Sequence, residues 1–68
     1  MTIELNGTPV AVGDSATVAE LVERAGAGGD RRGVAVAVDG EVVPRSAWQS
    51  TRLSEGQKVE VVGAIQGG

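Results

Sequence analysis

Residues 17–26 read "TVAELVERAG", and this stretch decides the fold because the spacing of apolar residues changes here from that of a strand to that of a helix. The apolar positions fall at i, i+3, i+4 and i+7, which places on one helical face Val18, Leu21, Val22 and Ala25. Thr17 and Glu20 match the S/T-x-x-E capping box, whose side chains satisfy free backbone N–H groups at a helix start. Gly26 is typical of a left-handed helix stop. The stretch therefore predicts one amphipathic helix of about two to three turns.

The segment before this helix has the pattern of a β-hairpin. Ile3 and Leu5 share one face of a strand, and Asn6-Gly7 is the pair best suited to the positive φ angles of a tight turn. A second strand is predicted over residues 9–12. Pro9 has no N–H to donate, so this strand is expected to start at its proline and to lie at a sheet edge.

Period-two alternation returns after the helix, in "GVAVAVDGEVVP" over residues 33–44. The larger side chains all fall on one face of the strand that this pattern predicts, namely Val34, Val36 and Val38. Asp39-Gly40 is a second turn signal, and a short strand follows at residues 42–43. Residues 45–51 indicate an irregular or single-turn segment, which would lay the Trp48 ring over the end of the core.

The last predicted strand covers residues 58–62, where Val59 and Val61 alternate with Glu60. The order is hairpin, helix, two strands, turn and final strand, and each apolar face needs one cover. This order predicts an α+β fold of the ubiquitin-like β-grasp type, with one helix packed on a mixed sheet of four to five strands. The folded domain is expected over residues 1–63, followed by a flexible tail at residues 64–68. The glycine-rich stretch 26–33 lacks the Walker spacing and is interpreted as a loop.

Composition excludes several classes of function. The 68 residues include no Cys and no His, so thiolate and imidazole metal sites, cysteine nucleophiles and histidine acid–base chemistry are excluded. Six basic residues against nine acidic ones give a net charge of −3, which argues against nucleic acid as a partner. No segment has the length of a membrane span or the pattern of a signal peptide. We expect a soluble, cytoplasmic, monomeric protein that binds no metal.

The chain finishes "AIQGG", and two terminal glycines are uncommon by chance. Glycine is 11 of the 68 residues, so a random Gly-Gly end has a probability of about 3% even in this chain. A glycine tail lacks Cβ atoms and is narrow enough to thread a channel in another protein. Its carboxylate is unreactive until an enzyme using ATP and Mg²⁺ activates it. These features predict either a sulfur carrier or a protein tag.

The chain resembles the ThiS family, the sulfur carrier proteins of thiamine biosynthesis, over essentially its whole length. The resemblance rests on "VAVAVDGEVVPRSAW" (residues 34–48), on "EGQKVEVVGAIQGG" (residues 55–68) and on the helical stretch quoted above. Two positions depart from the usual family pattern. Asp39 stands where Asn is usual, and Gly63 stands where Thr is frequent.

The resemblance implies that the chain is a protein co-substrate and not an enzyme, with no catalytic residue of its own. Gly68 would be adenylated by a ubiquitin-activating-like enzyme and converted to a thiocarboxylate, with sulfur relayed from cysteine by a desulfurase. Thiazole synthase would then take the sulfur into the thiazole ring. The tail residues expected to thread a partner's channel are Gly67, Gln66 and Ile65. Val62 and Ala64 are expected to contact a partner.

Two related functions stay open from the residues alone. The small subunit of molybdopterin synthase has the same fold and the same Gly-Gly end, and a ubiquitin-like modifier would form an isopeptide bond to lysine. Trp48 is interpreted as a core residue and Arg45 as a solvated side chain.

Overall fold

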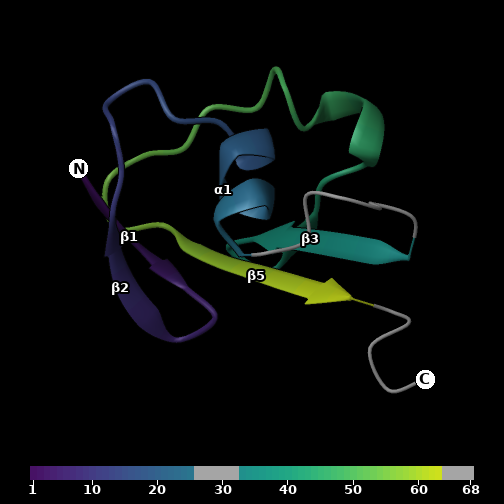
Figure 1. Ribbon diagram of the computed structural model, residues 1–68, viewed down its shortest axis with the longest axis horizontal. Helices are drawn as coiled ribbons and strands as arrows, with labels where there is room; N and C mark the ends of the chain where they lie inside the picture. Colours follow the sequence, from purple (N-terminus) through teal and green to yellow (C-terminus); the bar gives the residue numbers. More distant parts are fainter. Residues whose placement is uncertain (26–32, 64–68) are drawn as a thin grey trace.

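The structure, a computed structural model, describes residues 1–25 and 33–63. One helix lies across one face of a mixed β-sheet (Figure 1). The elements in chain order are β1 (Thr2–Leu5), β2 (Thr8–Ala11), α1 (Val18–Arg24), β3 (Val34–Val38), β4 (Glu41–Val42), the 3₁₀ helix η1 (Arg45–Ala47) and β5 (Lys58–Gly63).

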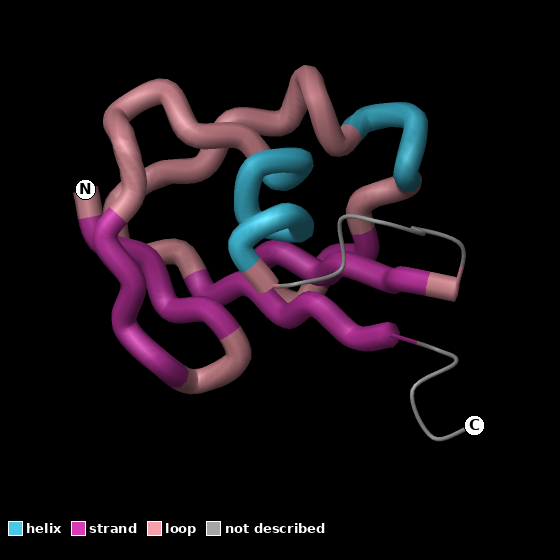
Figure 2. The backbone as a smooth tube through the Cα atoms, viewed as in Figure 1, coloured by secondary structure: helices cyan, strands magenta, loops and turns pink. Residues whose placement is uncertain are grey.

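The sheet has five strands in the order β2-β1-β5-β3-β4, so the last strand of the chain is its central strand. β5 runs parallel to β1 and antiparallel to β3, and the hairpins β1–β2 and β3–β4 form the two edges. Figure 2 shows the helix on one side of these strands and the long loops beyond it. The predicted β-grasp fold is confirmed, including the final strand beside the first. Among the described residues, no helix is long and apolar enough to cross a membrane.

The helix begins as the sequence predicts. The Thr17 hydroxyl accepts from the Glu20 N–H at 3.4 Å, and the Glu20 carboxylate accepts from the Thr17 N–H at 2.9 Å, which completes the capping box. The helix ends at Arg24, and Ala25 caps it with a right-handed φ of −76°. Ala25 is exposed, so its predicted place on the apolar face is wrong, because the helix ends one residue before it. The predicted stop at Gly26 lies outside the described residues.

The core is a single cluster between the helix and the inner face of the sheet. Its members are Ile3, Ala16, Val18, Leu21, Val22, Val36, Trp48, Leu53 and Val59. Trp48 is 2% exposed, and its indole N–H donates to the Val43 carbonyl at 2.9 Å. The ring therefore fills the core while its polar atom is satisfied. The predicted structural role of Trp48 is confirmed.

Strand ends differ from the predicted ones by about a residue, and the turns explain why. Asn6 and Gly7 have φ angles of 49° and 86°, so a two-residue turn pairs Leu5 with Thr8, and β2 starts before its proline. Pro9 pairs with Glu4 on an edge strand, as predicted. In the other hairpin Asp39-Gly40 forms the turn, so β4 covers Glu41–Val42 and not residues 42–43.

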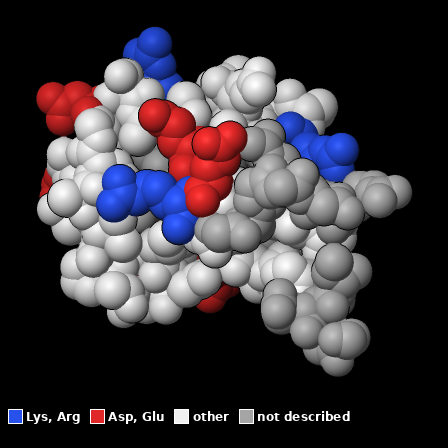
Figure 3. Space-filling model, viewed as in Figure 1, with Lys and Arg blue, Asp and Glu red and all other residues white. Residues whose placement is uncertain are grey.

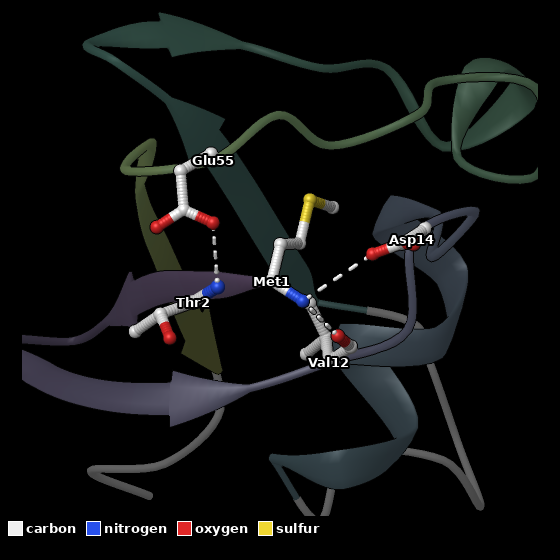
Figure 4. Close-up of polar contacts among 5 residues, drawn as sticks. All are labelled: Met1, Thr2, Val12, Asp14 and Glu55. Carbon is white, nitrogen blue, oxygen red and sulfur yellow. Dashed lines mark hydrogen bonds and ion pairs between the residues drawn. The ribbon is translucent and has the colours of Figure 1, made fainter.

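Polar contacts join the start of β1 to two loops (Figure 4). The Met1 ammonium donates to the Val12 carbonyl at 2.7 Å and lies 3.5 Å from an Asp14 carboxylate oxygen. The Thr2 N–H donates to the Glu55 carboxylate at 3.0 Å. The Met1 contacts tie the start of β1 to the loop after β2, and the Thr2–Glu55 bond ties it to the turn that leads into β5.

Candidate functional site

The candidate site is the place where the chain leaves the sheet, at the end of β5. We call residues Val61, Val62 and Gly63 the tail root, because the predicted tail follows them. β3 pairs with β5 along nearly its whole length, as far as Val34 opposite Gly63. β1 pairs with it at two positions, ending with Leu5 beside Val59. The tail root therefore emerges from the middle of the sheet, at the end of the molecule opposite the amino terminus (Figure 1).

Alternation along β5 separates a buried face from an exposed one. Val59 is 1% exposed and Val61 is partly buried against the core, whereas Val62 is 58% exposed. Val62, which the sequence analysis names as an expected partner contact, is thus an exposed apolar residue on the face opposite Val59 and Val61.

Val62 belongs to a small apolar area on the face of the sheet that the helix leaves uncovered. Residues directly opposite each other in neighbouring strands share a face. Val62 lies opposite Ala35, and Val42 lies opposite Ala37 two residues further along β3. We call Val62, Ala35, Ala37 and Val42 the outer patch. Val42 is 75% exposed, which makes it the more exposed of the two valines in this patch.

The sequence analysis did not single out Val42 as a candidate partner contact, although a signal for it was present. Val36 faces the core, so Ala37 faces outward, and a two-residue Asp39-Gly40 turn places Val42 opposite Ala37. Counting the register through the turn would have placed Val42 on the outer face.

Charges of both signs surround these surfaces. Glu60 lies opposite Ala37 and is exposed beside the outer patch. Further along the same face, Lys58 of β5 lies opposite Glu4 of β1 in the strand register. On the face shown in Figure 3, acidic and basic side chains lie next to each other over α1. Among the described residues, this face carries no broad basic area of the kind that binds a phosphate backbone.

The described part of the chain offers an exposed apolar surface that a partner could recognise. The sequence contains no Cys and no His, so nucleophilic catalysis by Cys and acid–base catalysis by His are excluded. Within residues 1–25 and 33–63, no group of three or more acidic side chains is placed to hold a metal ion. The predicted tail residues Ala64, Ile65, Gln66, Gly67 and Gly68 lie outside the described residues, so their roles stay predictions. The described part of the chain ends at the tail root, beside an exposed apolar surface.

A β-grasp domain whose central strand carries the carboxyl-terminal segment defines the chain as a ubiquitin-like protein. The model of the ThiS family matches residues 2–68, and the chain belongs to that family.

Two solved structures of a thiamine biosynthesis protein from Geobacter metallireducens are similar to this chain. The crystal structure is 31% identical, with a TM-score of 0.77, and the match covers 91% of both chains. The solution NMR structure is also 31% identical, with a TM-score of 0.75 and coverage of 91% of this chain and 81% of that one. No curated protein matches the chain.

Proposed function

We propose that the chain is a sulfur carrier of thiamine biosynthesis, whose terminal Gly68 is adenylated, converted to a thiocarboxylate and used as the sulfur source for a thiazole ring. The observation that carries the proposal is a ThiS-family β-grasp domain with its Gly-Gly segment attached to the central strand. The family match supports this function over a molybdopterin synthase subunit or a ubiquitin-like modifier.

Activation is required because the Gly68 carboxylate is a poor acyl donor. In the proposed first step a carboxylate oxygen attacks the α-phosphorus of Mg²⁺-bound ATP in a partner enzyme, and pyrophosphate leaves. A thiol reductant cleaves the persulfide of the cysteine-derived relay, forming a disulfide and releasing hydrosulfide, which attacks the carbonyl carbon of the acyl adenylate, and AMP leaves. The product is a terminal thiocarboxylate. The carrier supplies no catalytic group, in keeping with its lack of Cys and His.

The tail length sets how far the reactive group lies from the domain. Residues 64–68 can span at most about 18 Å beyond Gly63 at about 3.3–3.6 Å per residue. A partner that holds Gly68 in its active site therefore lies close to the end of β5. The exposed Val62 is on that strand, which makes the outer patch the contact surface that we propose for the activating enzyme and for thiazole synthase.

The function is tested by incubating the full chain with an adenylating enzyme of the ubiquitin-activating type, ATP, Mg²⁺ and a sulfide source. Intact mass spectrometry should show the exchange of one oxygen for sulfur, and digestion should place it on Gly68. A ladder of conjugates on lysine residues would instead indicate a protein modifier. An unchanged mass, with ATP consumption no higher than without the carrier, would contradict the proposal.

Removing Gly67 and Gly68 should abolish adenylation and leave the domain folded, because both residues follow the last strand. Adding one residue after Gly68 should be nearly as damaging, since it moves the carboxylate past the activating phosphate. Far-UV circular dichroism and the fluorescence of the buried Trp48 control for folding. Adenylation of either variant at the rate of the parent chain would show that the terminal carboxylate of Gly68 is not the reactive group.

A further inference from the structure

Two turn residues hold the central strand with their side chains. Asn6 and Asp39 are the non-glycine residues with positive φ in the described part of the chain, at 49° and 50°. Each is the first residue of a hairpin turn, and each reaches across to β5. Asp39 accepts from the Lys58 N–H at 3.0 Å, at the start of the strand. Asn6 reaches Val61, in the tail root.

The contact between Asn6 and Val61 uses both ends of the amide. Its Oδ1 accepts from the Val61 N–H at 2.8 Å, and its Nδ2 donates to the Val61 carbonyl at 3.2 Å. The last backbone hydrogen bond between this end of β1 and β5 is the one that the Asn6 N–H donates to the Val59 carbonyl at 2.9 Å. The side chain of Asn6 therefore supplies the next rung of the parallel ladder in place of backbone.

The register shows that β3 does not bond this peptide group. Hydrogen-bonded and non-hydrogen-bonded pairs alternate in an antiparallel ladder. The Asp39 N–H donates to the Lys58 carbonyl at 2.7 Å, so Val61, opposite Val36, is a non-hydrogen-bonded pair. The Val61 N–H and carbonyl point toward β1, where Asn6 meets them. Without that side chain, the described residues show no other partner for these two groups.

We propose that Asn6 is a positioning residue for the tail. Its side-chain amide bonds both the N–H and the carbonyl of Val61, a contact that we call the clip, and so fixes the point at which the chain leaves the sheet. The proposal rests on the proposed function for its consequence, because the exit point determines the free length of chain that carries Gly68. If the clip opens, β5 is held from one side only after Val59. The end of β5 then depends on β3 alone for its position, so the free segment can lengthen toward Val61, and the outward-facing Val62 is held less firmly beside the outer patch.

A longer free segment lowers the effective concentration of the carboxylate in a partner's active site, roughly as the −3/2 power of its length. Loss of the clip should therefore raise the KM for the carrier by up to about 1.7-fold, since the free segment lengthens from five residues (64–68) to at most seven (62–68). The kcat of adenylation should stay unchanged, because the reacting atoms and the partner's site are the same. A partly unfolded carrier would also raise the apparent KM at unchanged kcat, because only its folded fraction is competent, so far-UV circular dichroism must show that each variant is as folded as the parent chain.

The test compares Asn6→Gly with Asp39→Gly in the full chain. Glycine accepts both positive φ angles, so each variant keeps its turn. Asn6→Gly loses the side-chain contact to Val61, and Asp39→Gly loses the contacts to the Lys58 N–H and to the Gln57 side chain. Asn6→Gly should make the Val61 amide hydrogen exchange roughly tenfold faster. Backbone ¹⁵N relaxation should show lower order parameters for Val62 and Gly63. Asp39→Gly should instead affect the Lys58 amide and leave Val61 and the KM as in the parent chain.

Asn6→Asp gives an intermediate case, since a carboxylate still accepts from the Val61 N–H but cannot donate to its carbonyl. Its Val61 exchange rate and its KM should fall between those of the parent chain and Asn6→Gly. Equal Val61 exchange in the parent and Asn6→Gly overturns the proposal, and so does an unchanged KM in that variant. A parent chain that is not adenylated contradicts the proposed function, and amide exchange with ¹⁵N relaxation then decides the role of Asn6 independently.

Discussion

At the scale of single residues, Trp48 shows how a small core without other aromatic rings is completed. It is the only aromatic residue among the 68, it is 2% exposed, and its N–H is bonded to the Val43 carbonyl. Packing and polar satisfaction coincide in one side chain, so the stability of the domain should be sensitive to both properties of this ring.

Replacing Trp48 with Phe should lower the free energy of unfolding by about 1–3 kcal/mol, because the Val43 carbonyl loses its donor and part of the ring volume is empty. Trp48→Ala should cost about 3–5 kcal/mol, since most of the ring volume is removed. Urea denaturation followed by far-UV circular dichroism measures both. Equal stabilities of the two variants would show that ring volume is not what Trp48 contributes.

At the scale of elements, the features that could be predicted from the sequence are those that depend on residues close together in the chain. The capping box at Thr17, the turn at Asn6-Gly7 and the valine face of β3 are local patterns, and the structure contains each of them. The Asn6–Val61 contact was not predictable in this way, because it joins residues 55 positions apart and depends on where two strands end relative to each other. The outer patch has the same origin, since it is assembled from three strands.

The two faces of β5 give a matched pair of substitutions in one element. Val59→Ala should lower the free energy of unfolding by about 2 kcal/mol, since this side chain is 1% exposed in the central strand. Val62→Ala should change it by no more than about 0.5 kcal/mol, because Val62 is 58% exposed. Thermal and urea unfolding compare the two. A larger loss for Val62 would mean that the outer face is covered in the free protein.

At the scale of the whole molecule, the surface that we propose for partner recognition is separate from the core that stabilises the fold. The helix covers one face of the sheet and the core lies between them, while the side chains of the outer patch lie on the opposite face, away from that core. The two functions can therefore be probed separately, which is rarely simple in a domain of 68 residues.

A charge in the outer patch should weaken partner binding without unfolding the domain. We expect Val62→Asp to raise the KM for adenylation at least about tenfold, because the partner would have to desolvate a carboxylate against an apolar surface. Ala11→Asp is the matched control, since Ala11 is exposed on the edge strand β2, two strands away. If both variants have the same KM, the outer patch is not the contact surface that we propose.

The parallel arrangement of β1 and β5 also has a mechanical consequence. The amino-terminal strand β1 and the strand β5, which precedes the tail, lie side by side and run in the same direction. The start of β1 and the end of β5 therefore lie at opposite ends of the molecule (Figure 1). A pull on the tail, resisted at the amino terminus, loads the bonds between these strands in shear, so that they must break together and cannot be peeled apart one by one. An enzyme that draws the tail inward would therefore meet a domain that resists being unravelled from the end it grips.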